Sequence, residues 1–331
     1  GGINLEDIKA PECFYIERKL RDELNIPVMH DDQHGTAIIS GAALLNALEL
    51  QKKKIDKVRI VMNGAGAAAM ACAQMYVALG AKYENFIMFD KDGVLHEGRT
   101  DLDELRRKFM VKKSDWDLSK AMKDADVFVG LSVGNVVTQD MIKSMAKRPI
   151  VFALANPNPE ITYDLAAAVR EDLIMATGRT DFPNQVNNVL GFPYIFRGAL
   201  DVRARQINEA MKLAAVRALA ELARTPVPDI VNMAYNQKNM SFGPEYIIPK
   251  PLDPRLLSTV APAVAKAAME SGVAQKTIDN WDAYKVELNK RLGLDNQLIR
   301  ALGAKARRDT KRLVFAEADN LKVIKAASII Y

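Results

Sequence analysis

Two pairs of adjacent carboxylates near the start of the chain have the residue types of a divalent-metal site. Glu6 and Asp7 form the first pair, and Asp31 and Asp32 form the second. The helix predicted between them lets the chain fold back and bring the pairs together. Several carboxylates without matching Lys or Arg repel one another, a divalent cation relieves that repulsion, and hard oxygen ligands select Mg²⁺ or Mn²⁺. The structural alternative is that the first pair caps a helix and the second pair ends a strand.

A glycine-containing turn has the spacing of a dinucleotide-binding loop. The apolar run 58–62 leads into N-G-A-G-A-A-A, which fits G-x-G-x-x-A between a strand and a helix. Gly64 permits the tight turn, Gly66 lets the backbone approach a pyrophosphate, and Ala69 keeps the helix close to the strand. The free N–H groups at the helix N-terminus favour phosphate. The residues expected at the phosphates are Gly64, Ala65, Gly66, Ala67 and Ala68.

A carboxylate at the end of the next predicted strand supports this interpretation. Asp90 follows the apolar run 86–89, where a carboxylate can bind a ribose 2′-hydroxyl. In the simplest interpretation Asp90 favours NAD, but Lys91 follows it and could neutralise the 2′-phosphate of NADP. The sequence therefore predicts a nicotinamide cofactor and leaves NAD and NADP both open.

Two asparagine-rich loops follow predicted strands. They are 155–159, A-N-P-N-P, and 184–188, N-Q-V-N-N. Ligands of open α/β sheets bind beyond the carboxyl ends of the strands, where neutral amides can donate to a carboxylate or to a nicotinamide. The structural alternative is that these amides satisfy the backbone of their own loops.

The histidines at positions 30 and 34 are four residues apart, as in a zinc helix. H-D-D-Q-H lacks the glutamate beside the first histidine that the zinc motif uses, and Gly35 favours a turn. We therefore expect a polar turn over 30–35, followed by a helix from Thr36 to Leu50.

Five apolar runs of strand length alternate with helical segments, and they predict the fold class. Their apolar character is continuous, which is typical of strands buried on both faces. We expect an α/β fold, a doubly wound Rossmann-type parallel sheet with flanking helices. Helices are also predicted over 8–25, 201–224 and 255–309. The five runs are 58–62, 86–89, 127–131, 150–154 and 173–175.

Composition excludes several protein classes. The chain has 331 residues, is 49% hydrophobic and carries a net charge of +5. No apolar run reaches the roughly 20 residues of a membrane span, and no secretory leader is visible. The only cysteines, Cys13 and Cys72, indicate a reducing cytoplasm rather than a disulfide framework. The short basic runs are more typical of solvated helix ends than of a nucleic-acid surface, so we expect neither a membrane nor a nucleic-acid partner.

Taken together, the motifs resemble those of bacterial malic enzymes. The resemblance is dense and in order over residues 1–255. It rests on G-G-I-N-L-E-D-I-K-A-P-E-C-F, H-D-D-Q-H-G-T-A, N-G-A-G-A-A-A, A-N-P-N-P-E and G-R-T-D-F-P-N-Q-V-N-N-V-L-G-F-P-Y-I-F-R-G-A-L-D. It implies oxidative decarboxylation of malate to pyruvate and CO₂, with reduction of NADP or NAD and with Mg²⁺ or Mn²⁺ as Lewis acid.

The resemblance also assigns roles to residues. The family's metal ligands fall on Glu6, Asp7 and Asp32, and Asp31 matches a residue that supports the catalytic base. Asn156 and Asn188 match positions that contact substrate or nicotinamide. The family's general base is a lysine and its general acid a tyrosine, and both match positions upstream of Gly1.

The last residues resemble the start of a phosphotransacetylase-type domain, the arrangement of hybrid bacterial malic enzymes. Both ends suggest a segment of a longer polypeptide. We expect 1–35 to end an N-terminal domain that carries metal ligands, 36–255 to form the NAD(P)-binding domain, 256–310 to be a helical linker, and 311–331 to begin a second α/β domain. The resemblance implies acetyl-CoA as an effector of that second domain, and a homo-oligomer.

Two other functions stay open. The first is NAD(P)-dependent oxidation of another small hydroxy acid without decarboxylation. The second, for this segment alone, is a catalytically incomplete cofactor-binding module.

Overall fold

The computed structural model describes residues 1–112, 114–293, 314 and 323–324. The helix expected over 294–309 lies outside the described residues. So does the expected second α/β domain, 311–331, apart from three positions.

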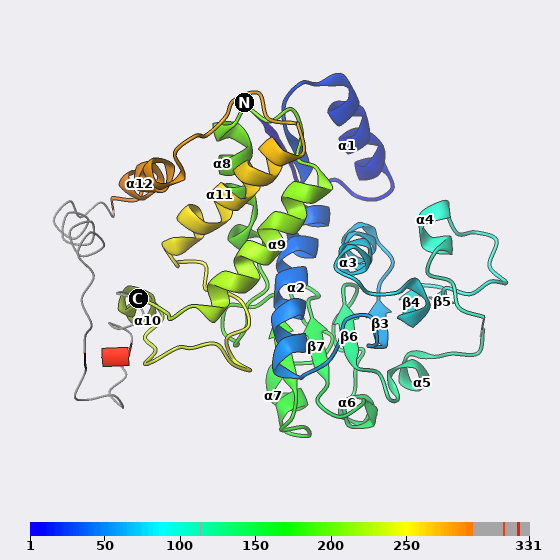
Figure 1. The fold of residues 1–331 in the computed structure, drawn as a ribbon. Helices are drawn as coiled ribbons and strands as arrows, with labels where there is room; N and C mark the ends of the chain where they lie inside the picture. Colours follow the sequence, from blue (N-terminus) through cyan, green and yellow to red (C-terminus); the bar gives the residue numbers. More distant parts are fainter. Residues whose placement is uncertain (113, 294–313, 315–322, 325–331) are drawn as a thin grey trace.

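A six-stranded sheet forms the centre of the fold (Figure 1). Its strand order is β5-β4-β3-β6-β7-β8, and all neighbouring pairs are parallel except β4 and β5. The predicted Rossmann-type sheet is confirmed, while the short antiparallel edge strand β5 was not predicted. The strands are β3 (Ile60–Asn63), β4 (Phe86–Asp90), β5 (Gly93–Val94), β6 (Val127–Gly130), β7 (Ile150–Ala153) and β8 (Ile174–Thr177).

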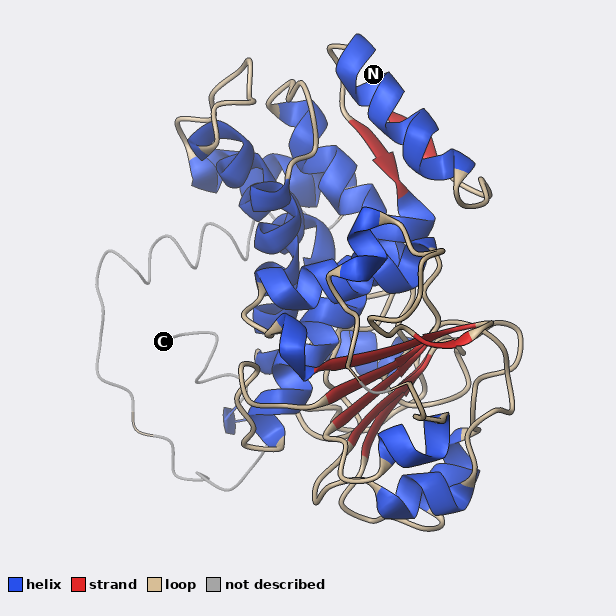
Figure 2. Ribbon diagram, turned by 90° about the vertical axis from the view of Figure 1, so that its right-hand side faces the viewer, coloured by secondary structure: helices blue, strands red, loops and turns tan. Residues whose placement is uncertain are grey.

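Helices cover both faces of this sheet, as Figure 2 shows. Successive residues of β3 point to opposite faces: Ile60 and Met62 belong to one apolar core and Val61 to the other. The smaller core is closed by α5 (Leu118–Met122), α6 (Gln139–Ser144) and α7 (Tyr163–Ala167). The larger core is closed mainly by α2 (Asp31–Leu50), α3 (Ala67–Ala78), α8 (Phe192–Asp201), α9 (Glu209–Arg224) and α11 (Arg255–Glu270).

A second, two-stranded sheet brings the first carboxylate pair to the second. Strand β1 (Ile3–Leu5) lies parallel to β2 (Val28–His30), with helix α1 (Glu12–Glu23) between them in sequence. Leu5 pairs with His30, so Glu6 and Asp31 both follow directly at the same end of the sheet. The predicted fold-back of the chain is therefore confirmed, and strand pairing produces it.

The polar turn expected over 30–35 is wrong, because helix α2 begins at Asp31. His30 is its extended N-cap residue, and the two aspartates in the first turn interact favourably with the helix dipole. Gly35 is helical as well. A Cβ atom there would lie 2.2 Å from Asp31 Oδ1 and 2.9 Å from Asn188, so close packing explains this glycine.

Two other helix predictions need correction. The helix expected over 201–224 is two helices, because α8 ends at Asp201 and α9 begins at Glu209 after the Asn208 side chain caps it. The helical stretch expected from 255 contains α11 and α12 (Trp281–Arg291), with residues 271–280 non-helical between them. The remaining short elements are the 3₁₀ helices η1 (Tyr83–Asn85) and η2 (Asn188–Leu190), with α4 (Glu104–Arg107) and α10 (Asp229–Ala234).

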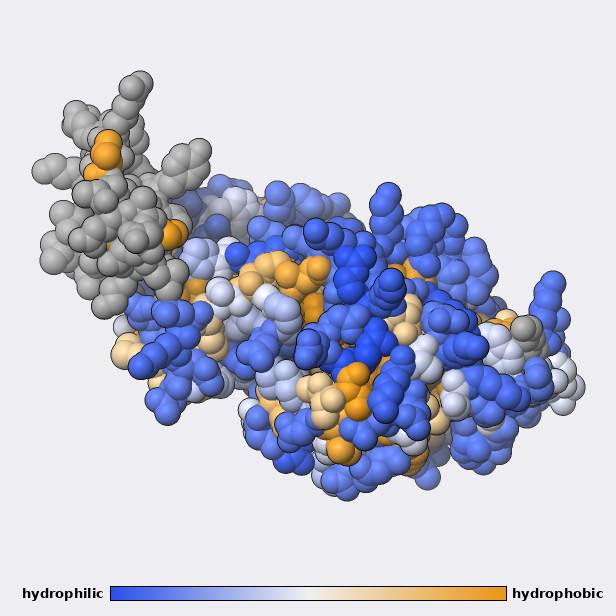
Figure 3. Space-filling view, turned by 90° about the horizontal axis from the view of Figure 1, so that it is seen from below, coloured by the Kyte–Doolittle hydropathy of each residue, from blue (hydrophilic) through white to orange (hydrophobic). Residues whose placement is uncertain are grey.

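No helix of the described residues is both long enough and apolar enough to span a bilayer. The face seen from below is mostly hydrophilic and carries only small apolar patches (Figure 3). Cys13 and Cys72 are free and buried, which agrees with the expected absence of a disulfide framework.

Candidate active site

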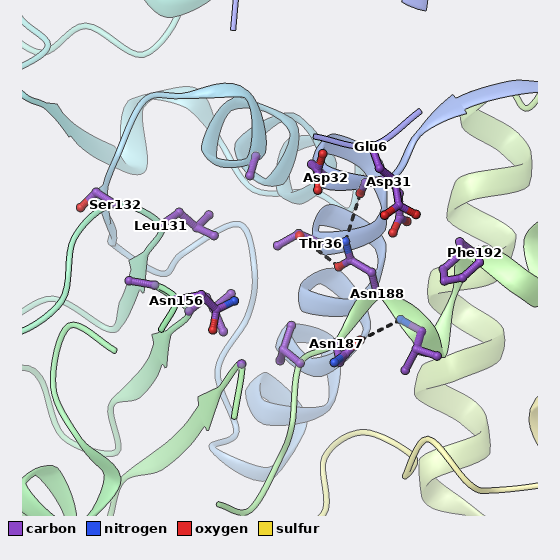
Figure 4. A pocket seen from close by; sticks show the side chains of 16 residues that line it. Glu6, Asp31, Asp32, Thr36, Leu131, Ser132, Asn156, Asn187, Asn188 and Phe192 are labelled. Carbon is purple, nitrogen blue, oxygen red and sulfur yellow. Dashed lines mark hydrogen bonds between the residues drawn. The ribbon is translucent and has the colours of Figure 1, made fainter. Parts of the chain in front are cut away.

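A cavity of about 610 Å³ opens between the N-terminal sheet and the carboxyl ends of β6, β7 and β8. Figure 4 shows the carboxylates Glu6, Asp31 and Asp32 on one side of it, and Ser132 and Asn156 on the other. The lining is Glu6, Asp31, Asp32, Thr36, Ala68, Leu131, Ser132, Leu154, Ala155, Asn156, Gly178, Val186, Asn187, Asn188, Val189 and Phe192.

The carboxylate wall of the cavity has no internal counter-charge. Glu6, Asp31 and Asp32 line it, and no lysine or arginine is among the lining residues. Burial raises the pKa of Asp31 to about 6, and the charges of Glu6 and Asp32 act in the same direction. The wall therefore favours a bound cation or protonated carboxylates.

Asp7 lies outside this wall. Its N–H donates to Asp32 Oδ2 at 2.9 Å, its backbone has a φ of 56°, and it is exposed. Among the described residues, only Asp90, Asp92 and Asp101 gather three such ligand atoms within 4.8 Å of one another. The predicted metal ligands Glu6, Asp7 and Asp32 are therefore neighbours, but their oxygen atoms do not all lie within 4.8 Å of one another.

The donor set nevertheless fits a hard divalent cation. The buried Asp31 Oδ1 accepts no hydrogen bond, and the Asp32 side chain is 48% exposed toward the opening. Asn4 Nδ2 donates to Glu6 Oε1 at 2.8 Å and holds that side chain in place. Carboxylate oxygens with free lone pairs and no nearby ammonium are the chemistry that Mg²⁺ or Mn²⁺ prefers.

Asn188 connects the second asparagine loop to the carboxylate wall. Its Nδ2 donates to the Asp31 carbonyl oxygen at 3.2 Å, and its Oδ1 accepts from Thr36 Oγ1 at 3.1 Å (Figure 4). It therefore lines the cavity as predicted and also fixes the first turns of α2.

The glycine turn has the geometry of a pyrophosphate site. Gly64 has a φ of +126°, and a Cβ atom there would lie 2.7 Å from the Leu131 carbonyl oxygen, so only glycine fits. Gly66 is the N-cap of α3, and a Cβ atom there would meet nothing within 4 Å, which leaves room for a ligand. Ala65 is buried, Ala67 begins the helix and Ala68 lines the cavity.

Asp90 ends β4 as predicted, but it already has a strong partner. Arg99 Nη1 donates to Asp90 Oδ1 at 2.7 Å, and Arg99 Nη2 lies 2.5 Å from Asp101 Oδ2. Burial opposes ionisation of Asp90, yet the Arg99 and Asp92 N–H bonds outweigh it and lower its pKa. A ribose hydroxyl would thus meet an ionised, fixed carboxylate. Lys91 is 90% exposed and lies 3.9 Å from Asp92.

The sequence interpretation missed several lining residues. Asn156 lies in the cavity as predicted, whereas Ser132 was not singled out, Thr36 was named only as a helix start, and Asn187 only as a member of its asparagine-rich loop. Ser132 follows β6 at the edge where Gly64 and Asn156 lie, and Asn63 Nδ2 donates to its hydroxyl at 2.7 Å. A polar residue two positions after a buried strand was the available signal.

The two histidines do not share a metal. His34 Nε2 lies 2.9 Å from Glu17 Oε1, and His34 Nδ1 lies 3.1 Å from Lys212 Nζ, so both ring nitrogens have protein partners. His30 is fully buried on β2. The turn that we expected at these residues does not exist, because His30 caps α2 and His34 lies within it. The argument against a shared zinc site is therefore that His34 already has a partner at each ring nitrogen.

The proteins to which this chain is similar agree with this geometry. Residues 33–233 match the family model described as malic enzyme, NAD binding domain. The chain belongs to the malic enzyme family. The NADP-dependent malic enzyme of Haemophilus influenzae is 53% identical over 98% of this chain and 43% of its own length. An NAD-dependent malic enzyme of Rhizobium meliloti is 50% identical over 100% of this chain and 43% of its own length.

A solved structure of the family has the same fold. The crystal structure of the Entamoeba histolytica malic enzyme superposes with a TM-score of 0.76 at 38% identity, over 99% of this chain and 66% of that one. The family predicted from the resemblance of the motifs is thereby confirmed, and so is the NAD-binding domain in which the glycine turn lies. The chain spans less than half the length of the two curated relatives, so the activity of a whole protein is a separate question.

Proposed function

We propose that the protein containing this chain catalyses the oxidative decarboxylation of malate to pyruvate and CO₂, with NADP or NAD as the hydride acceptor. One observation carries the proposal: a single cavity joins an uncompensated carboxylate wall to a strand edge that adjoins a dinucleotide turn. Malate is a dianion, so a cavity lined by three carboxylates and no cationic side chain suits it only when a cation lies between them.

We assign cofactor binding to one side of the cavity and substrate and metal binding to the other. On the cofactor side, the Gly64–Gly66 turn and Ala68 hold the pyrophosphate, Asp90 binds the ribose, and Asn156 contacts the nicotinamide or substrate. On the substrate side, Asn188 donates to malate. Glu6, Asp7 and Asp32 hold Mg²⁺ or Mn²⁺, and Asp31 supports the catalytic base. The bound cation would supply Lewis-acid stabilisation of negative charge on the substrate oxygen during loss of CO₂.

The resemblance implies a catalytic lysine and tyrosine that match none of the 331 residues of this chain, so we propose the activity for the protein containing this chain. Support for a longer protein comes from the curated relatives, of which this chain spans 43%. We propose the hybrid arrangement, with domains at 1–35, 36–255, 256–310 and 311–331. Acetyl-CoA is then an effector of the last domain, and the assembly is a homo-oligomer.

A side-by-side titration with NADP and NAD tests the proposed reaction. With malate and Mn²⁺ present, the protein containing this chain should release pyruvate and CO₂ in equal amounts with the reduced cofactor. Removal of Mn²⁺ and Mg²⁺ with a chelator should stop the reaction. Accumulation of oxaloacetate without CO₂ would instead identify a simple hydroxy-acid dehydrogenase. The ratio of kcat/KM for the two cofactors decides the preference.

A further inference from the structure

A buried glutamate behind the cavity has no role in the proposed function. Glu160 follows β7 and is 0% exposed, yet it is not among the residues that line the cavity. Among the described residues, no lysine or arginine forms an ion pair with it. Its side-chain hydrogen bonds are instead to two backbone N–H groups, one in its own loop after β7 and one in the loop after β6.

Those two loops form the cofactor side of the cavity. The Ser132 N–H donates to Glu160 Oε1 at 3.3 Å, and the Ala155 N–H donates to Glu160 Oε2 at 3.2 Å. Ser132 and Ala155 both line the cavity, and Ala155 precedes Asn156. Each carboxylate oxygen therefore holds one backbone N–H, one in the loop after β6 and one in the loop after β7. The Val137 N–H also donates to the Glu160 carbonyl oxygen at 3.0 Å, so the side chain acts beside a backbone link between the two loops.

The end of β6 is shaped to receive this carboxylate. A Cβ atom on Gly130 would lie 2.1 Å from the Glu160 carboxyl carbon, so the space beside Gly130 is filled by the acid. The bond from Asn63 to Ser132 extends the connection to β3, directly before the glycine turn. Two strand ends are thus joined through the buried carboxylate, and a third is joined to them through the Ser132 hydroxyl.

A glutamine could not make the same contacts. Both partners of Glu160 are donors, so the site needs two acceptor oxygens, and an amide NH₂ group would face an N–H. Burial raises the pKa of Glu160, while the N–H groups of Ala155 and Ser132 oppose that rise. We propose that Glu160 is a positioning residue for the cofactor, and that its carboxylate sets the spacing of the loops after β6 and β7 that the nicotinamide dinucleotide requires.

The role rests on the proposed function, because it takes a nicotinamide dinucleotide as the ligand of these loops. Binding is measured directly, by titrating the chain with NADPH and following the cofactor's fluorescence. Glu160→Gln should raise the Kd for NADPH about tenfold, the loss expected for one charged hydrogen bond. The matched control is Glu171→Gln, the same change at an exposed position, which should leave the Kd unchanged.

Binding of Mn²⁺ separates positioning from general damage to the fold. The proposed metal ligands come from β1 and α2, so Glu160→Gln should leave the Kd for Mn²⁺ within about twofold of the wild-type value. Gly130→Ala leaves the carboxylate present but displaces it, and it should weaken NADPH binding in the same selective way. Melting curves show that each variant is folded before it is titrated.

Three results would overturn the role. A folded Glu160→Gln variant with the wild-type Kd for NADPH removes the positioning function. If Glu160→Gln weakens NADPH binding and Mn²⁺ binding equally, Glu160 is a purely structural residue. A wild-type chain that does not bind NADPH contradicts the proposed function itself, and the role of Glu160 falls with it.

Discussion

The described structure contains two groups of three neighbouring carboxylates, and they are neutralised differently. Asp90, Asp92 and Asp101 surround the Arg99 guanidinium, which bonds two of them directly. The carboxylate wall of the cavity, formed by Glu6, Asp31 and Asp32, has no cationic side chain among its neighbours in the lining.

The difference shows that closeness of carboxylates alone does not identify a metal site. The Arg99 group has its oxygens closer together, within 4.8 Å, but the protein supplies its cation internally. The carboxylate wall is looser and leaves Asp31 with an unpartnered buried oxygen. We therefore expect the looser group to be the one that takes a cation from solution.

The largest effect should come from the carboxylate wall. Asp32→Ala should lower malate turnover by about 1,000-fold, because it removes a ligand of the cation that stabilises the transition state. The free energy of unfolding should change by less than about 1 kcal/mol, since relief of repulsion offsets the lost helix-dipole interaction. Mn²⁺-dependent rates and urea denaturation measure the two quantities.

The control for that change is Asp22→Ala, at an exposed position of α1. It should leave both turnover and stability at the wild-type values. An Asp32→Ala variant with an unchanged dependence of rate on Mn²⁺ would refute the ligand assignment.

In the Arg99 group the effect should fall on stability instead. Arg99→Met should lower the free energy of unfolding by about 2 kcal/mol, because it leaves the half-buried Asp90 without its charged donor. Arg107→Met, at an exposed position on α4, is the matched control and should be nearly neutral. Urea denaturation at neutral pH decides between them, and equal curves for the two variants would show that Arg99 does not neutralise the group.

The smallest effect concerns pH. The Arg99 hydrogen bond lowers the pKa of Asp101 from 3.8 to about 2, and the pKa of Asp90 is lowered as well. A lowered folded-state pKa stabilises the protein above the ordinary value, and the gain is lost as the pH falls toward 2. Between about pH 4 and pH 2, the wild-type chain should therefore lose stability more steeply than Arg99→Met. If both proteins lose stability equally as the pH falls, Arg99 is not the cause of these pKa shifts.

The sheet and the glycine turn could be predicted because their signals are local. Continuous apolar runs place β4, β6 and β7 within one residue of their observed bounds, and β3 within two. The first turn of α2 could not be predicted in this way, since H-D-D-Q-H-G has the composition of a loop. Its glycine is explained by close packing against Asp31 and against Asn188, and Asn188 is 153 positions away in the chain.

The same limit applies to the site. Asn156, Asn188 and Asp32 were found because they stand in recognisable motifs, and all three line the cavity. Arg99 and Glu160 were given no role, because each also binds a group in another segment, at the end of β4 or in the loop after β6. Only the assembled sheet shows which polar groups these two side chains satisfy.

The contact between Gly130 and Glu160 has a consequence for the history of the sequence. The two positions share one small volume, so neither can change freely while the other is kept. Among members of the family we expect them to vary together: a side chain at position 130 should accompany a shorter residue at position 160. A natural sequence that pairs alanine at 130 with glutamate at 160 should show the loops after β6 and β7 moved apart.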